Sequence, residues 1–133
     1  MTETPIDAAH AAMQAAPEDD TARLRFYDRL ATAELFLMLT EEPEGDSITP
    51  DLFEVQGSRF VLAFDLEDRL SGFAGRAVPY AAMSGRALAQ MLAGQGIGLA
   101  LNPEVAPSAI LLPPEALGWL VDTLGHAPAQ AEA

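Results

Sequence analysis

The stretch PYAAMSGRALAQMLAGQGIGLALNP, residues 79–103, decides the fold of this 133-residue chain. Residues 79–83 favour a strand, Ser84 is a helix N-cap, and residues 86–93 form a helix with one apolar face. A glycine turn follows, and residues 97–101 favour a second strand. About a dozen residues separate the two strands, which is enough for the right-handed crossover that joins parallel neighbours. The stretch therefore predicts a strand–helix–strand unit.

The same arrangement precedes this unit in the chain. Residues 59–64 read as a strand, Asp65 as the cap of a helix over residues 66–73, and glycine and proline then break the chain before residue 79. The strands at 59–64, 79–83 and 97–101 are therefore expected to run parallel, joined by two helix crossovers.

Two shorter strands are predicted upstream. The apolar segment ELFLML at 34–39 and residues 53–56 both read as strands, and Gly57 with Ser58 supplies a two-residue turn into residues 59–64. The sequence thus predicts a three-stranded antiparallel meander in this part of the chain.

Helices and one further strand complete the chain. Thr4, Pro5 and Asp7 resemble a helix start, and a short helix over 6–15 follows. The next helix begins near Asp20, and its predicted core face consists of Leu24, Tyr27, Leu30 and Ala31. A strand at 109–112 lacks a preceding helix and should pair antiparallel. The final helix starts at Pro114, ends at Gly125, and has the apolar stripe Leu117, Leu120, Val121 and Leu124.

These elements predict one domain of the α/β (α+β) class. We expect a mixed five- to six-stranded sheet with an antiparallel meander, βαβαβ crossovers and helices packed on it. Residues 1–20 are assigned to an N-terminal helical segment, 21–125 to the main domain, and 126–133 to a disordered tail.

Composition excludes several classes of function. Seven arginines and no lysine stand against twenty acidic residues, giving a net charge of −13, which disfavours nucleic acid and anionic membranes as partners. The lack of cysteine removes disulfides and thiol chemistry. Neither a signal peptide nor a long apolar span is evident, so we expect a cytoplasmic protein that does not enter membranes.

The segments ELFLML, RFVLAFD, PYAAMSGRAL, GQGIGLALNP and ILLPPEAL together resemble the N-terminal domain of the SseB family, named for enhanced serine sensitivity. The resemblance spans residues 22–124. It implies a small α/β domain of poorly defined role, sometimes linked to regulation of a rhodanese-like sulfurtransferase, without established catalytic residues. Larger members carry a second, C-terminal domain, so a role that needs both halves is not expected here.

No motif in the sequence predicts catalysis. Ser84 lacks the flanking glycines of a nucleophile elbow, and His10 and His126 lie in terminal segments. The glycines of AGQGIGL precede a strand, whereas a dinucleotide fingerprint follows one. The acidic loop of Glu41, Glu42, Glu44 and Asp46 does not have EF-hand spacing and reads as a solvated turn. We therefore expect no enzyme activity, cofactor or metal.

One group of residues is a candidate binding edge. Asp65, Ser84 and Asn102 each follow a strand predicted to be parallel, and Arg86 is the first residue of the helix that Ser84 caps. Ligands of open α/β sheets bind at such carboxyl ends, which predicts a pocket there. Helix capping and turn formation are the simpler roles for the same side chains.

Trp119 lies beside the apolar stripe of the final helix, where it either closes the core edge or anchors a partner. The sequence as a whole favours a non-catalytic interaction or regulatory domain that binds another protein, or itself as a homo-oligomer. The alternative is a small-molecule sensor or unconventional enzyme that uses the edge around Asp65, Ser84 and Asn102.

Overall fold

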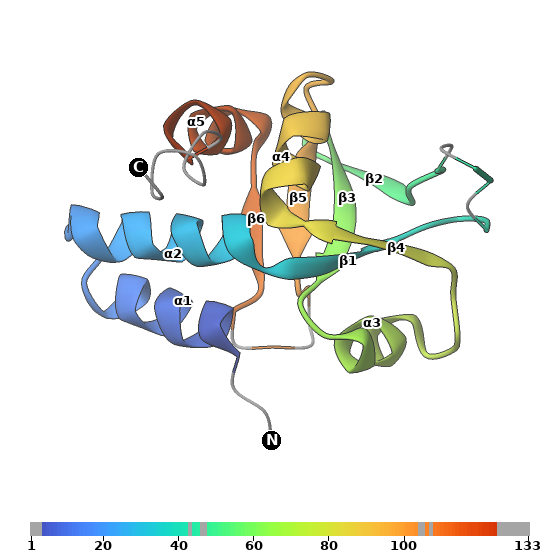
Figure 1. The fold of residues 1–133 in the computed structure, drawn as a ribbon, viewed down its shortest axis with the longest axis horizontal. Helices are drawn as coiled ribbons and strands as arrows, with labels where there is room; N and C mark the ends of the chain where they lie inside the picture. Colours follow the sequence, from blue (N-terminus) through green and yellow to red (C-terminus); the bar gives the residue numbers. More distant parts are fainter. Residues whose placement is uncertain (1–3, 43, 46–47, 104–105, 107, 125–133) are drawn as a thin grey trace.

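The structure, a computed structural model, describes residues 4–42, 44–45, 48–103, 106 and 108–124. Five helices and six strands follow in the order α1 (Pro5–Ala15), α2 (Asp20–Thr32), β1 (Glu34–Met38), β2 (Leu52–Val55), β3 (Ser58–Phe64), α3 (Glu67–Ala74), β4 (Tyr80–Ser84), α4 (Gly85–Ala93), β5 (Gly98–Leu101), β6 (Ile110–Leu112) and α5 (Pro114–Leu124) (Figure 1). No helix in these ranges is long and apolar enough to span a membrane.

The six strands form one mixed sheet in the order β4-β1-β3-β5-β6, and β2 also pairs with β3. β3 and β5 are parallel, and every other pairing is antiparallel. The predicted fold class is therefore confirmed, as is the antiparallel pairing of the strand that follows the proline loop.

The strand neighbours differ from the prediction in two places. β1 and β2 both pair with β3, at Phe64 and Ala63 and at residues 58–61, so the predicted meander order is wrong. β4 pairs with β1 rather than with β3 or β5, so only two of the three predicted parallel strands are neighbours. Strand propensity and crossover length predict where strands form, but not which strands pair. In the structure β1 lies between β3 and β4, so β4 does not reach β3.

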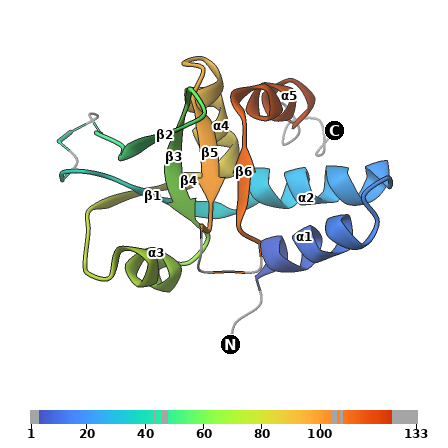
Figure 2. The ribbon, with the colours of Figure 1, turned by 180° about the vertical axis from the view of Figure 1, so that it is seen from behind.

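Helices cover the two faces of the sheet unequally. The main core joins residues of α1, α2, α4 and α5 to one face, among them Phe26, Leu88 and Leu120. A smaller cluster on the other face contains Leu70 of α3. Figure 2, which looks onto this second face, shows α3 below β3 and β5 and no described helix across their upper part.

The β2–β3 hairpin turns one residue earlier than predicted. Gln56 and Gly57, rather than Gly57 and Ser58, have positive φ angles of 52° and 85°. A two-residue hairpin of this type needs left-handed backbone at both central positions, and Ser58 already pairs with Val55.

The core face of α2 is also shifted from the prediction. Leu30 and Ala31 are buried as expected, but Leu24 is 43% exposed and Phe26 is fully buried. Helical periodicity allows either Leu24 or Phe26 to face the core. Phe26 does so because α2 packs against α1 and α4.

The start of α4 requires a glycine. Ser84 caps this helix, as predicted, because its Oγ accepts a hydrogen bond from the Ala87 backbone N–H at 3.1 Å. A Cβ atom on the next residue, Gly85, would lie 1.8 Å from the Leu30 carbonyl oxygen. Glycine thus lets α4 begin in direct contact with the backbone of α2.

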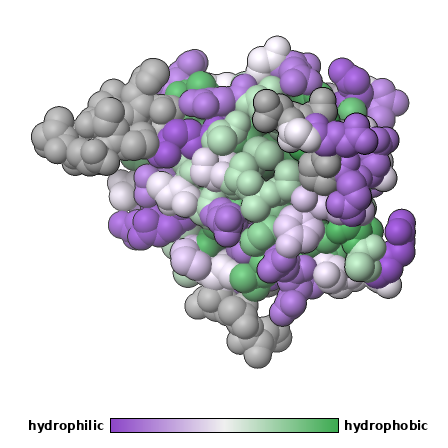
Figure 3. All heavy atoms as spheres, turned by 45° about the vertical axis from the view of Figure 1, so that its right-hand side comes forward, coloured by the Kyte–Doolittle hydropathy of each residue, from purple (hydrophilic) through white to green (hydrophobic). Residues whose placement is uncertain are grey.

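β4 is an edge strand, with Tyr80 and Ala82 exposed. On the side of the molecule that carries β4, apolar residues gather in the middle of the surface and hydrophilic residues border them (Figure 3). Self-association of the chain, which stays a prediction, could therefore use β4 as an unpaired strand edge.

Candidate functional site

The structure brings two of the four predicted edge residues together. Asp65 follows β3 and Asn102 follows β5, and because these strands are parallel neighbours both residues lie at the same end of the sheet. Asn102 Oδ1 accepts a hydrogen bond from the Asp65 backbone N–H at 3.1 Å. Asn102 is fully buried and has a positive φ of 48°, a conformation that asparagine tolerates better than most residues.

Helix α1 reaches this strand end through its first turn. Thr4 and Asp7 form the predicted helix start as a capping box: Thr4 Oγ1 accepts from the Asp7 N–H, and Asp7 Oδ2 accepts from the Thr4 N–H, both at 3.1 Å. Thr4 Oγ1 also donates to Asp65 Oδ2 at 2.5 Å. The cap therefore connects α1 to the end of β3 in addition to starting the helix.

Arg69 of α3 lies between two carboxylates. Its guanidinium contacts Asp7 in bidentate fashion, at 3.0 Å from Nη1 to Oδ1 and 2.6 Å from Nη2 to Oδ2. The same Nη1 lies 2.8 Å from Asp65 Oδ1. All three side chains are at least nine-tenths buried, so water screens these charges only weakly.

Ser108 closes the network on its far side. Asn102 Nδ2 donates to Ser108 Oγ at 2.9 Å, and Ser108 Oγ donates to Asp7 Oδ1 at 2.6 Å. We call Thr4, Asp7, Asp65, Arg69, Asn102 and Ser108 the strand-end network. Every buried side-chain nitrogen and oxygen that the structure describes has a partner, so the network's polar atoms are engaged in holding α1, α3, β3 and β5 together.

The electrostatics of Asp7 follow from these contacts. Burial raises the pKa of its carboxyl group. Hydrogen bonds from Arg69, Ser108 and the Thr4 N–H, together with the Arg69 charge, outweigh this effect and lower the pKa from 3.8 to about 2. The hydrogen bond to Asp7 in turn raises the pKa of Arg69, against the opposing effect of burial. Both groups are therefore charged near neutral pH.

We expect acid to weaken the fold through Asp7. Because the folded-state pKa is lower than the unfolded one, this carboxylate stabilises the fold above about pH 4, and its contribution is lost as the pH falls toward 2. The shift corresponds to about 2 kcal/mol. Urea unfolding of wild type and Asp7→Asn between pH 6 and pH 2 measures this, and the difference between the two proteins should shrink across that interval. A constant difference would contradict the assignment.

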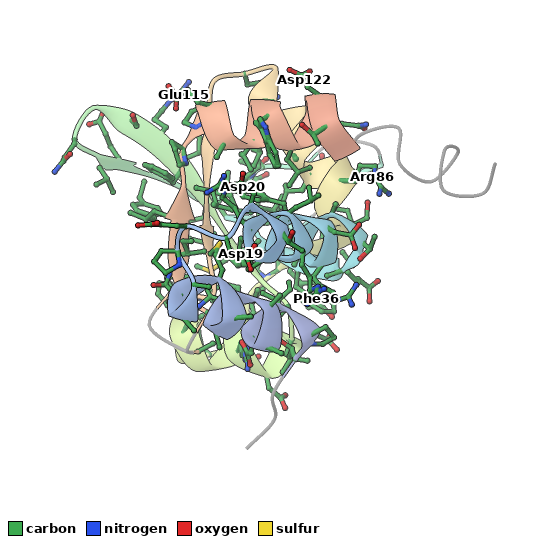
Figure 4. All side chains as sticks on the ribbon, turned by 90° about the vertical axis from the view of Figure 1, so that its left-hand side faces the viewer. Asp19, Asp20, Phe36, Arg86, Glu115 and Asp122 are labelled. Carbon is green, nitrogen blue, oxygen red and sulfur yellow. The ribbon has the colours of Figure 1, made fainter. Side chains whose placement is uncertain are left out.

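Ser84 and Arg86, the other two predicted edge residues, lie elsewhere. Ser84 pairs with Glu34 of β1, which separates β4 from β3 and hence Ser84 from Asp65. Arg86, on α4, lies away from the end of the molecule that contains α1 and α3 (Figure 4). Asp65 does not cap α3, since the N-cap residue is Leu66 and makes no side-chain cap bond. Whether the edge binds a ligand stays a prediction.

A groove of about 730 Å³ runs along the outside of the strand-end network. Its walls come from the first turn of α1, the end of α2 and the start of β1, and Asp65 and Phe36 also border it. Arg29 and Glu34 supply charges at its margin. Space for a small molecule therefore exists beside Asp65, although the carboxylate oxygens of Asp65 contact Thr4 and Arg69.

A second hollow, of about 480 Å³, lies on the less covered face of the sheet. It is lined by Met38, Asp51, Phe53, Leu62, Phe73, Ala100, Pro103 and Leu111. Leu111 pairs with Ala100 across β6 and β5 and is 48% exposed. We call this hollow the open-face groove. Phe73, one of its aromatic walls, packs against Phe64.

Trp119 lies at the surface beside the buried residues of α5, and whether it anchors a partner stays a prediction. It is 42% exposed, and its ring contacts Tyr27 edge-on with 5.0 Å between ring centroids. Arg23, Tyr27, Ala116 and Trp119 line a cleft of about 240 Å³ between α2 and α5. His10, treated as too close to the terminus to be positioned, is instead held in α1 against the ring of Phe26.

Sequence reasoning missed the charged centre of the strand-end network. Arg69 was not singled out, and Thr4 and Asp7 were interpreted only as a helix start. The spacing of Asp65 and Arg69, four residues apart at the beginning of a helix, was the available signal. Nothing local indicated Asp7, which is separated from Arg69 by 62 residues.

Comparison with known families agrees with this architecture. The family model for the SseB protein N-terminal domain matches residues 7–119, most of the chain. The chain belongs to this family. A search of the curated proteins and a search of the solved structures each gave no match. The SseB N-terminal domain of this chain thus includes α1 from Asp7 onward, and with it the acidic partner of Arg69.

Some predictions fall on residues that the structure does not describe. These are Asp46 of the acidic loop, Gly125 as the helix end, His126, and the tail at 126–133. Among the described residues, no group of three or more histidine, cysteine or acidic side chains is arranged to hold a metal ion.

Proposed function

We propose that this SseB-family domain is a non-catalytic protein-interaction module that binds an apolar segment of a partner protein in the open-face groove. The observation that carries the proposal is the unequal covering of the sheet. Among the residues that the structure describes, four helices contribute to the core on one face, whereas α3 alone contributes to the cluster on the other. An exposed apolar hollow is typical of a docking surface.

The groove has the composition of such a surface. Met38, Phe53 and Phe73 present flexible and aromatic side chains, which are enriched at protein interfaces, and each is only partly buried. Leu111 projects at its edge with nearly half of its surface exposed. Because a partner can cover these groups without displacing a helix, binding need not disturb the fold.

Charge supports a basic partner. The net charge of −13 produces a field that attracts positively charged proteins and accelerates their association. Asp51 lies in the wall of the groove and provides a local acceptor for a basic residue that flanks the apolar segment.

Leu111→Glu is expected to abolish partner binding while the domain remains folded. The substitution places a charge at the edge of the groove, where its desolvation would oppose docking. Tagged wild type and variant are used to isolate partners from native lysate and are compared by quantitative mass spectrometry. The matched control is Leu24→Glu, which changes a leucine of similar exposure on α2.

A protein retained by wild type and by Leu24→Glu, but lost with Leu111→Glu, supports the proposal. If all three baits retain the same proteins, the groove is not the docking site. A wild-type dimer that light scattering detects, and that Leu111→Glu dissociates, would assign the groove to self-association instead.

The second candidate is binding of a small molecule in the 730 Å³ groove beside Asp65. The observation that favours it is the size of that groove, which is within the range of ligand pockets. A thermal-shift screen with small metabolites separates the two candidates, because a specific ligand raises the melting temperature by mass action.

A further inference from the structure

The floor of the open-face groove is formed by three adjacent strands. Leu62 of β3 pairs with Ala100 of β5, and Ala100 pairs with Leu111 of β6. Because directly paired residues project from the same face of a sheet, these three side chains form one row across it. Phe53 of β2 and Phe73 of α3 also line the groove. The groove is therefore an apolar bed on the face of the sheet.

The backbone beneath this bed is already engaged within the sheet. β3 pairs with β5 along one edge and with β1 and β2 along the other, and β5 lies between β3 and β6. The N–H and C=O groups of both strands thus hydrogen-bond to neighbouring strands. Asp51 is the only polar residue among the described residues that line the groove. The groove offers few partners to the backbone of a bound segment.

An extended segment would fit this surface poorly. Its backbone N–H and C=O groups would lose water over apolar side chains and gain no hydrogen bond in return, which is unfavourable. Pairing would require the outer edge of β6, which is only three residues long and is followed by Pro113, a residue without an N–H. An α-helix satisfies its backbone groups internally and presents only side chains to the groove.

The open face also has room for a helix. Helices α1, α2, α4 and α5 cover the other face of the sheet, whereas α3 leaves the upper part of β3 and β5 without a described helix (Figure 2). Domains of this class bury the faces of their sheets under helices. A helix that lies beside α3 would complete this second layer, with Phe73 at the boundary between the two.

We propose that the segment bound in the open-face groove is an amphipathic α-helix of the partner protein, with a basic residue at the margin of its apolar face. This deepens the proposed function and rests on it, because it specifies the conformation and pattern of the partner's segment. Apolar residues at positions i, i+3 or i+4, and i+7 would contact the row of Leu62, Ala100 and Leu111. The basic residue would face Asp51.

Selection from a peptide library tests the pattern directly. Random peptides of about 15 residues, long enough for roughly four helical turns, are displayed on phage and selected on the wild-type chain. We expect the enriched peptides to have apolar residues with the helical period and at least one arginine or lysine. Leu111→Glu should lose these peptides, and Leu24→Glu, with a leucine of similar exposure on α2, should retain them.

A synthetic copy of one enriched peptide tests the conformation. Its helical circular dichroism should increase on binding, in proportion to the fraction bound. Proline at a central position outside the apolar face should weaken binding by about a hundredfold, because proline disrupts a helix interior. Alanine at the same position is the control and should have little effect.

Substitution of Asp51 tests the position of the basic residue. Asp51→Asn should weaken binding of the peptide by roughly twofold to fivefold, as expected for loss of an exposed ion pair. The matched control is Glu54→Gln. Glu54 is exposed and, because side chains alternate along β2, lies on the face opposite Phe53 and the groove. This control should bind the peptide as wild type does.

The outcomes separate this inference from the proposed function. Enriched peptides whose apolar residues alternate with a period of two, and which Leu111→Glu loses, would overturn the helix but leave the groove as the docking surface. A proline variant that binds as tightly as its parent peptide would do the same. If Leu111→Glu retains the enriched peptides, or if no peptide is enriched, both the helix and the docking surface are contradicted.

Discussion

Arg69→Met is expected to destabilise the domain by about 3–5 kcal/mol, a large share of the stability of a domain of this size. The substitution keeps the apolar stem but removes the guanidinium, leaving Asp7 and Asp65 as neighbouring buried carboxylates without their cation. Urea unfolding at pH 7, compared with wild type, measures the loss.

The matched control is Arg29→Met, which breaks an exposed ion pair with Asp28. Exposed pairs contribute at most about 1 kcal/mol, so this variant should unfold close to wild type. If the two arginine variants lose the same free energy of unfolding, burial does not explain how the strand-end network stabilises the fold.

Gly85→Ala is expected to destabilise the domain by about 3 kcal/mol, at the upper end for an added methyl group. The new Cβ would lie 1.8 Å from the carbonyl oxygen and 2.7 Å from the carbonyl carbon of Leu30. Since both are backbone atoms of α2, no side-chain rotation relieves the overlap. The helices α2 and α4 would have to separate, and the urea midpoint should fall accordingly.

Gly72→Ala is the control for this substitution. Gly72 lies in α3, and a Cβ there would meet no atom within 4 Å. Alanine favours the helix by about 0.5–1 kcal/mol relative to glycine, so this variant should be slightly more stable than wild type. If both alanine variants shift the midpoint alike, close approach of α2 and α4 does not explain the glycine at residue 85.

The candidate site was predictable only in its position. The sequence placed Asp65 and Asn102 at the same end of two parallel strands, and the structure confirms that they are in contact. It did not predict that Asp7 and Arg69 would complete the arrangement, because ion pairs between distant segments leave no local pattern. The surroundings of Trp119 were likewise undetermined until α2 was placed beside α5.

The features that depend on neighbouring residues follow from the sequence: the number and types of elements, the caps at Thr4 and Ser84, and the mixed sheet. Hydrogen bonds within one turn and the periodicity of apolar residues fix these. Three features depend on tertiary packing: β1 lies between β3 and β4, Phe26 rather than Leu24 enters the core, and Asp65 binds Arg69 instead of capping α3. Those outcomes depend on which distant segments pack together, and so on the free energy of the assembled core rather than on any stretch of the chain.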